Sequence, residues 1–321
     1  MEADRKLIAR KLFRLRVHEA KGVEYQHLFE KVMQYRYPDF IPIKPYGNIG
    51  DRKNDGYIPI TGTYFQVYAP ENPESSRSET KAAAKVAEDF EGLRANWSPI
   101  KAFHFVFNDS YRGSPPPVED ALATIRADHK IEASVFLAKD LEREALDLEE
   151  DQLSDVINTP IPEVGPLPNV DFQCLREVIN HVLRTKPLAS PTSGLQAPDF
   201  DEKIEFNGLT RQVGSLLTAA SYQNEAVVDY FSKNSTFARQ QVRDQLAGMY
   251  IESKVRLNGV ADSLGAGAGD LVFFDLLQRI IPESDGTASH AQRVAAQEAA
   301  IVVMAFYFEA CDIFEDPNAV A

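Results

Sequence analysis

The stretch Gly50-Asp51-Arg52-Lys53-Asn54-Asp55-Gly56, followed by Tyr64-Phe65-Gln66-Val67-Tyr68, decides the fold of the first half of the chain. Residues 56–60 and 64–68 are rich in aromatic and β-branched side chains, as strands usually are. The turn Thr61-Gly62-Thr63 separates the two runs. Two strand-like runs joined by a short glycine-containing turn predict a β-hairpin.

Polar side chains interrupt this hairpin at places suited to a metal ion. Side chains alternate between the two faces of a strand, so Tyr64, Gln66 and Tyr68 share a face. Asp55 stands at the start of the first strand. An Asp at that place can share a metal ion with a polar residue on the neighbouring strand. Mg²⁺ prefers such oxygen ligands; it lowers the pKa of a bound water and polarises a phosphate. A tight turn without metal is the simpler alternative for Asp51 and Asp55.

Around the hairpin, helix-like and strand-like segments alternate. Apolar residues at helical spacing cover residues 3–36, and Gly22 divides them into two helices. The prolines at 38, 42 and 45 prevent a further helix directly after them. The other segments of this half are a helix at 80–95, a strand at 102–107, a helix at 118–128 and a strand at 133–138. This order predicts a mixed α/β domain over residues 1–156.

The second half of the chain has a different pattern. Residues 157–198 are rich in proline and contain one short helix-like segment at 171–185, so we expect a connector there. From residue 199 to residue 321, apolar residues recur at helical spacing only. We therefore expect a separate all-α domain at 199–321.

Composition and charge limit the classes of function. The chain has 321 residues, and 48 acidic residues outnumber 34 Lys and Arg residues, which gives a net charge of −14. Such a chain does not coat nucleic acid over its whole surface. The basic run at 5–21 allows one local basic patch, or merely a solvated helix face, and residues 140–155 are acidic. Two cysteines, no signal peptide and no membrane-spanning run lead us to expect a cytoplasmic protein without membrane contact.

The polar residues of the first half resemble those of a nuclease superfamily. Gly22-Val23-Glu24-Tyr25, the 50–56 turn and Gln66-Val67-Tyr68 look like the restriction-endonuclease-like, or PD-(D/E)XK, nucleases of the Mrr-type branch. The resemblance implies an α/β (α+β) restriction-endonuclease-like fold. It also implies that Glu24, Asp55 and Gln66 hold Mg²⁺ or Mn²⁺, and that Asp51 supports the turn.

The sequence departs from this family at the residue that steadies the phosphate. Tyr68 stands where the family has its catalytic lysine, and Lys53 stands where the turn has its middle glycine. A tyrosine does not neutralise a developing negative charge as an ammonium group does. The lysine sometimes migrates in this superfamily, and the candidates here are Lys53, Lys81 and Lys85, of which we take Lys81 as the catalytic one.

The second half resembles another family. Residues 200–209 contain the pattern Lys-Ile-x-x-Asn-x-Leu, and Tyr250 follows at a matching distance. They look like the helical C-terminal domain of effector subunits in ABC-three-component systems, which are bacterial anti-phage operons. This implies docking on an ABC/SMC-like ATPase, a small middle-component protein as a further partner, and Lys203, Asn207 and Tyr250 as docking residues. A generic helical bundle, in which Lys203 and Asn207 only cap or solvate a helix, is the alternative.

Together the two resemblances predict the effector subunit of a bacterial defence complex that cleaves DNA with a metal ion. A catalytically inactive nuclease-like subunit, which binds DNA or scaffolds the ATPase, is the alternative that Tyr68 favours. A purely structural interaction protein is a third candidate, which the net charge of −14 favours. A homodimer is compatible with each of them.

Overall fold

The computed structural model describes residues 1–47, 50–70, 76–167, 169–185, 200–233, 236–260, 267–283, 288–310 and 312–317. The chain forms two compact units. We call residues 13–157 the sheet unit, and residues 1–12 together with 158–321 the helical unit. The division after residue 157 lies where we expected the first domain to end, and the first twelve residues group with the helical unit.

The sheet unit and the helix that leads into it follow the predicted order. The break between two helices at Gly22, the hairpin and the two later strands are confirmed. The elements are α1 (Ala3–Glu19), α2 (Val23–Arg36), β1 (Ile41–Pro42), β2 (Gly56–Ile58), β3 (Thr63–Tyr68), α3 (Ser76–Asn96), β4 (Ala102–Phe107), α4 (Pro116–His129), β5 (Glu132–Leu137), α5 (Ala138–Leu146) and α6 (Glu150–Val156).

The described strands form one five-stranded sheet in the order β1-β2-β3-β4-β5. The first three strands are antiparallel, whereas β3, β4 and β5 are parallel. Parallel neighbours need a long crossover connection, and α3 and α4 supply the two that this sheet requires. The register pairs Gly56 with Phe65 and Gln66 with Phe105, so the start of β2 and the middle of β3 lie side by side.

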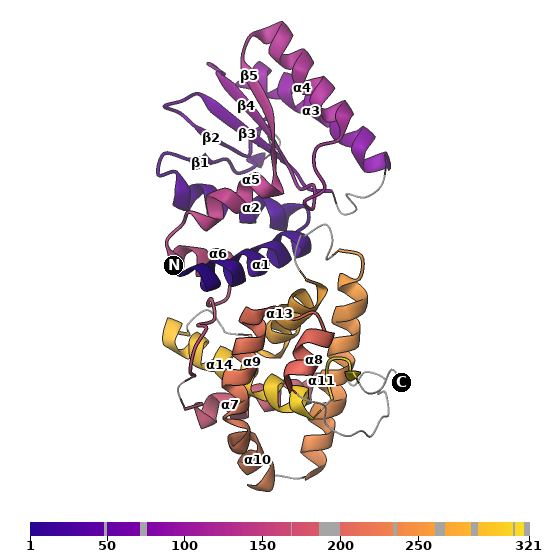
Figure 1. Cartoon of the computed structure of the whole chain (residues 1–321). Helices are drawn as coiled ribbons and strands as arrows, with labels where there is room; N and C mark the ends of the chain where they lie inside the picture. The colour runs from indigo at the N-terminus through magenta and orange to yellow at the C-terminus, as the bar shows by residue number, and fades with distance from the viewer. Residues whose placement is uncertain are drawn as a thin grey trace. The chain divides into compact units, whose positions relative to one another are not determined.

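Helices cover both faces of the sheet. On one face, the Phe29 ring of α2 packs against Phe65 and Phe136, with ring centroids 5.5 and 5.9 Å apart. On the other face, α3 and α4 lie beside each other and bury an apolar cluster that includes Tyr64 and, at its margin, Tyr68 (Figure 1). The predicted alternation along β3 is therefore confirmed, and it places Gln66 on the face covered by α3 and α4.

The acidic stretch forms two helices, α5 and α6, that we did not predict. Its leucines and alanines recur at helical spacing and are buried, while most of its carboxylates lie outside this apolar stripe. Several of those carboxylates pair with basic residues of the first two helices, as in the ion pairs Arg14–Glu142 at 2.6 Å and Arg36–Glu144 at 3.0 Å. The acidic stretch thus forms two amphipathic helices, and these pack against α2.

The helical unit contains only helices among its described elements, as the sequence predicts. Residues 186–198, the last part of the expected connector, lie outside the described residues. Between Ala299 and Phe308 the last helix is buried on every side, which makes it the centre of this unit. The elements are α7 (Phe172–Arg184), α8 (Phe200–Phe206), α9 (Arg211–Ser221), α10 (Asn224–Lys233), α11 (Thr236–Leu257), α13 (Ala268–Ile280) and α14 (His290–Glu309).

The first twelve residues are tied to the rest of the helical unit by polar contacts. Lys11 forms an ion pair with the fully buried Asp270 and also donates to Thr210 Oγ1 at 3.0 Å. Arg5 donates to the carbonyl of Ile161 at 3.0 Å. The basic run at 5–21 therefore includes side chains that serve internal contacts.

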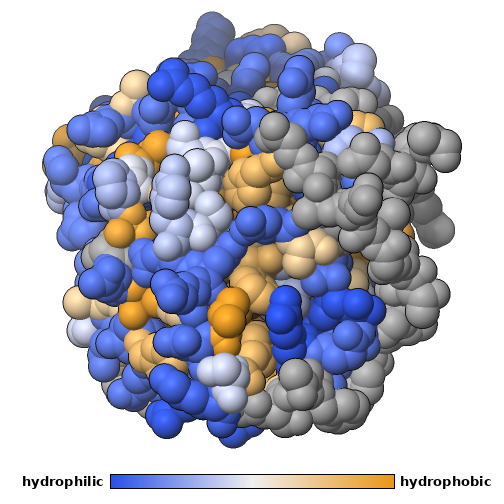
Figure 2. Space-filling view, turned by 60° about the horizontal axis from the view of Figure 1, so that its bottom comes forward, coloured by the Kyte–Doolittle hydropathy of each residue, from blue (hydrophilic) through white to orange (hydrophobic). Residues whose placement is uncertain are grey.

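None of the described helices combines the length and the apolar character that crossing a bilayer requires. In Figure 2, which brings the α10 end of the molecule forward, hydrophilic side chains cover most of the face that is not grey, and apolar side chains interrupt them near its middle. This mixture is that of an ordinary protein surface.

Candidate functional site

The turn before β2 is shaped by side chains that bond to the backbone. Asp51 Oδ1 accepts a hydrogen bond from the Lys53 N–H at 2.8 Å, and Asn54 Oδ1 accepts one from the Gly56 N–H at 3.1 Å. Such bonds let non-glycine residues adopt a left-handed backbone. Arg52 and Lys53 have φ angles of 57° and 59°. Asp51 thus supports the turn, as its position in the sequence suggests.

Asp55 and Gln66 are cross-strand neighbours at the end of this turn. The Asp55 N–H donates to the Phe65 carbonyl at 3.0 Å, and Asp55 Oδ2 accepts a hydrogen bond from the Val67 N–H at 2.6 Å. Both side chains are buried, with 3% and 6% of their surface exposed. The structure therefore brings together two of the three predicted metal ligands, and we call this pair the candidate cation site.

The charge state of Asp55 depends on its surroundings. Burial raises its pKa to about 7, and the nearby carboxylates of Asp51, Glu30 and Asp89 act in the same direction. The Val67 N–H acts in the opposite direction, because it bonds to the ionised form. A carboxyl group with a pKa near neutrality lacks a compensating positive charge, which a bound cation would supply.

Gln66 carries an unsatisfied buried acceptor. In the part of the chain that the structure describes, its Oε1 atom has no hydrogen-bond partner. An unpaired buried polar atom costs about 1–3 kcal/mol, so its retention calls for an explanation. Amide oxygens of this kind are among the ligands that suit Mg²⁺ or Mn²⁺.

The third predicted ligand, Glu24, lies elsewhere. It is exposed in the first turn of α2 and is not among the groups that raise the pKa of Asp55. The α2 carboxylate that does so is Glu30, which accepts a hydrogen bond from Gln26 at 2.9 Å. Sequence matching missed Glu30, whose only signal is that it follows the core residue Phe29. No group of three or more His, Cys, Asp or Glu residues suited to a metal ion occurs among the described residues.

The candidate lysines fall into two groups. Lys53 and Lys85 both bond to Asp89 of α3, at 2.8 and 3.0 Å, whereas Lys81 is exposed on the same helix. The hydrogen bonds to Asp89 and Glu88 raise the pKa of Lys53. Two of the three candidates thus converge on one carboxylate beside the candidate cation site.

Tyr68, at the position of the family lysine, has an apolar environment. Its ring stacks on Phe105 and Phe107 with centroid distances of 5.9 and 6.0 Å, and burial raises the pKa of its hydroxyl. The residue therefore extends the apolar cluster under α3 and α4. It supplies no positive charge.

The predicted docking residues form an internal contact instead of an exposed surface. Lys203 is 1% exposed, and its ammonium group donates to the carbonyls of Phe308 and Ile313 at 2.6 and 2.8 Å. The Asn207 side-chain amide donates to the carbonyl of Glu315 and accepts from its N–H, and the Tyr250 hydroxyl donates to the Glu315 carboxylate. We call the described residues 308–310 and 312–315 the hook, because these three side chains hold them against α8 and α11. Neither docking through Lys203 nor a solvated position for it matches this burial.

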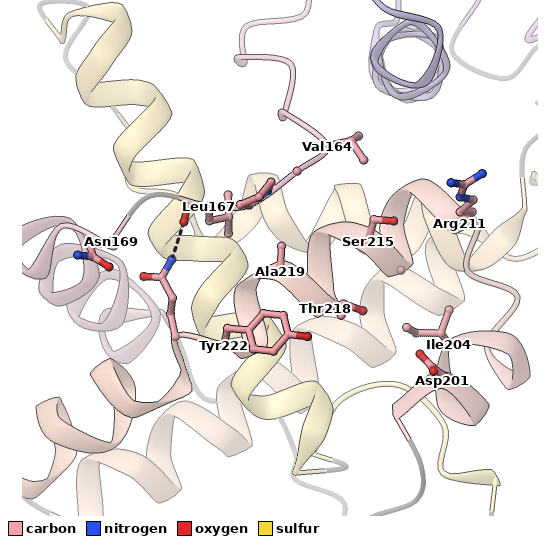
Figure 3. A pocket seen from close by; sticks show the side chains of 14 residues that line it. Val164, Leu167, Asn169, Asp201, Ile204, Arg211, Ser215, Thr218, Ala219 and Tyr222 are labelled. Carbon is pink, nitrogen blue, oxygen red and sulfur yellow. Dashed lines mark hydrogen bonds between the residues drawn. The ribbon is translucent and has the colours of Figure 1, made fainter.

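An open pocket of about 760 Å³ lies in the helical unit between residues 164–167 and 169 on one side and helices α8 and α9 on the other. Side chains of α9 that line it include Arg211, Ser215 and Thr218, and Tyr222 lines it just after the end of this helix (Figure 3). The Gln223 amide donates to the Leu167 carbonyl at 3.5 Å. None of the three predicted docking residues lines this pocket.

The helical unit matches a known family. No curated protein and no solved structure matches the chain. Residues 173–315, however, match the family model of C-terminal domain 10 of the ABC-three component (ABC-3C) systems. The match extends from the start of α7 to the end of the hook and begins earlier than residue 199, where we expected the domain to start. The second half of the chain is thus similar to the C-terminal domain of an ABC-three component system.

Proposed function

We propose that this chain is the effector subunit of an ABC-three component defence system, in which the sheet unit cleaves DNA and the helical unit docks on the ATPase of the system. The docking part rests on the family match of residues 173–315. The cleavage part rests on one observation, the unsatisfied Gln66 Oε1 beside the buried carboxyl group of Asp55.

The order of elements in the sheet unit supports the nuclease part. A helix, an antiparallel hairpin, a helix and a parallel strand follow one another from α2 to β4. The helix and the strand after the hairpin stand where a restriction-endonuclease-like domain would have them. On this reading Asp55 and Gln66 would be the residues that hold the metal ion.

The chemistry would depend on a small number of side chains. Asp55 and Gln66 would hold Mg²⁺ or Mn²⁺, which when bound neutralises negative charge on a phosphate. The Val67 N–H fixes one carboxylate oxygen of Asp55, which leaves the other oxygen free to face an ion. The enclosed position of both side chains strengthens electrostatic interactions with a charged ligand.

Tyr68 favours a second candidate, a nuclease-like subunit without activity. Its ring is held in an apolar stack and supplies no charge to a phosphate. Glu24 is exposed and does not complete a set of three ligands. In this alternative, the sheet unit would bind DNA or a protein partner, and the defence complex would obtain its activity from another subunit.

Cleavage of plasmid DNA by the full chain tests the proposal, alone and together with the ATPase of the same system, in Mn²⁺. We expect Asp55→Ala and Gln66→Ala to lose activity by about a hundredfold or more, as removal of groups that stabilise a transition state does. Glu91→Gln, which changes an exposed carboxyl group of α3, is the matched control. Undiminished cleavage by Asp55→Ala would refute the cation-dependent mechanism, and DNA binding without cleavage by the wild type would favour the second candidate.

A further inference from the structure

Asp89 is a buried carboxylate close to the candidate cation site. None of its side chain is exposed, and its Oδ1 atom accepts hydrogen bonds from Lys53 at 2.8 Å and from Lys85 at 3.0 Å. Its Oδ2 atom has no hydrogen-bond partner within the described ranges. A buried carboxylate that binds two ammonium groups restricts the position of both.

The two lysines come from different elements and meet only at Asp89. Lys85 lies one helical turn before Asp89 on α3, whereas Lys53 belongs to the turn that carries Asp55. The Lys53 side chain crosses α3 at Gly92, where an added Cβ would come within 2.6 Å of Lys53 Cγ. The absence of a side chain at position 92 therefore allows the turn lysine to reach the helix carboxylate.

Each ammonium group keeps at least one hydrogen-bond donor beyond these contacts. An ammonium group has three donors, and Lys85 gives one of them to Asp89, while Lys53 gives one to Asp89 and one to the exposed Glu88. Both lysine side chains are 33% exposed, so a ligand has access to them. Because both nitrogen atoms bond to the same oxygen, they lie within about 6 Å of each other.

We propose that Lys53 and Lys85 form a phosphate-binding pair for nucleic acid beside Asp55 and Gln66, with Asp89 as the residue that positions the pair. This inference rests on the proposed function for the identity of its ligand. It assigns the task of the missing family lysine to two side chains from the turn and α3. Lys81, which we took as the catalytic lysine from the sequence, lies one turn before Lys85 and is exposed.

The positioning role predicts an unusual response to a charge change. Removing a negative charge beside a phosphate site strengthens binding if only net charge matters, since opposite charges attract and like charges repel. If Asp89 instead holds the two lysines in place, Asp89→Asn weakens binding although the protein becomes less negative. The sign of the effect therefore separates the two roles.

The experiment measures binding of a fluorescein-labelled DNA duplex of about 20 base pairs to the full chain by fluorescence anisotropy, in Ca²⁺ and over a range of KCl concentrations. We expect Lys53→Ala and Lys85→Ala each to weaken binding about tenfold and to lower the salt slope by about 1, the value for one phosphate contact. Lys85→Arg should retain most of the affinity. Asp89→Asn should weaken binding about as much as either lysine variant.

Controls on the same helix separate positioning from general effects. Glu91→Gln and Arg94→Ala remove the two partners of an exposed ion pair of 2.7 Å and should leave affinity within about twofold. Gly92→Ala should weaken binding without any change at Asp89, because it displaces Lys53. The fluorescence of Trp97, which lies beside Tyr57 and Tyr64 of the sheet, reports whether each variant is folded.

Each outcome decides the inference. Wild-type protein that fails to bind the duplex, or Asp89→Asn that binds as well as or better than the wild type, overturns it. Weakened binding by Lys81→Ala together with normal binding by Lys85→Ala also overturns the inference, because the phosphate-binding lysine would then be Lys81. Asp55→Asn is judged by cleavage: retained cleavage by that variant would refute the proposed function, while the lysine pair is judged by binding alone.

Discussion

Ionisation of Asp55 should destabilise the free protein, and Asp55→Asn should relieve this effect. The pKa of Asp55 rises from an ordinary value of 3.8 to about 7 in the folded chain. In the unfolded chain the group ionises near its ordinary pKa, so the folded state holds a proton that the unfolded state has lost between about pH 4 and pH 7. The folded state is therefore most stable, as far as Asp55 is concerned, below about pH 4. This contribution of the retained proton to the unfolding free energy is lost as the pH rises to about 7.

The magnitude follows from the size of the shift. One pKa unit corresponds to about 1.4 kcal/mol, so a rise of about three units amounts to roughly 4 kcal/mol of unfolding free energy. An asparagine keeps an oxygen that accepts the Val67 N–H and carries no charge. We expect Asp55→Asn to equal the wild type at pH 4 and to exceed its stability by about 2–4 kcal/mol at pH 8 in the presence of EDTA.

Urea unfolding followed by tryptophan fluorescence measures this difference for the sheet unit. Trp97 is the single tryptophan of the chain, and its indole N–H donates to the carbonyl of Arg52 in the turn before Asp55, at 3.3 Å. Saturating Mn²⁺ should remove most of this difference, since an ion at a hundred times its Kd stabilises the wild type by about 2.7 kcal/mol and the variant hardly at all.

The matched control is Glu91→Gln, an exposed carboxyl group on α3 whose change should leave the pH dependence unaltered. Stability curves of wild type and Asp55→Asn that run parallel from pH 4 to pH 8 would refute the assignment of a buried, nearly neutral carboxyl group. An equal response of both proteins to Mn²⁺ would refute the cation site.

Three further changes test other parts of the structure. Lys203→Met leaves two carbonyls of the hook without their donor and should lower the unfolding free energy of the helical unit by about 2–3 kcal/mol, measured by circular dichroism in urea. Gly56→Ala places a Cβ within 2.3 Å of the Phe40 ring and should cost about 1–3 kcal/mol, measured by tryptophan fluorescence in urea. Mn²⁺ affinity, measured by calorimetry, should rise about tenfold from pH 6 to pH 8, because Asp55 loses its proton over that range.

Each of these changes has its own control. Lys233→Met alters an exposed lysine of α10 and should be neutral, so equal destabilisation by both lysine changes would contradict the hook contact. Gly165→Ala has open space around its added Cβ and should also be neutral. Gln66→Ala should weaken Mn²⁺ binding at every pH while leaving its pH dependence, whereas an affinity that does not change with pH would exclude Asp55 as a ligand.

Local sequence patterns were sufficient for most of the sheet unit. The glycine at position 22, the hairpin turn and the alternation along β3 depend on neighbouring residues only, and all three are confirmed. The helices α5 and α6 escaped prediction although they also follow a local pattern. Their acidic residues suggested only a charged stretch, whereas the spacing of leucines such as Leu141 and Leu153 indicates amphipathic helices.

The environment of a polar side chain was harder to predict, because distant segments create it. Lys203 has an ordinary solvated appearance in the sequence, yet its partners Phe308 and Ile313 follow it by more than a hundred residues. Asp89 looked like one acid among several on a helix. Its role as a partner of two lysines appears only when α3 is packed beside the turn before β2.

The backbone at Lys53 has a consequence for how this turn could change over evolutionary time. The family that the turn resembles has glycine there, and Lys53 keeps the left-handed conformation, with a φ of 59°, that glycine adopts freely and other residues adopt at a cost of roughly 1–2 kcal/mol. A return to glycine would relax the chain but remove the bond to Asp89. Descendants of this sequence are therefore expected to change positions 53 and 89 together, or to change neither.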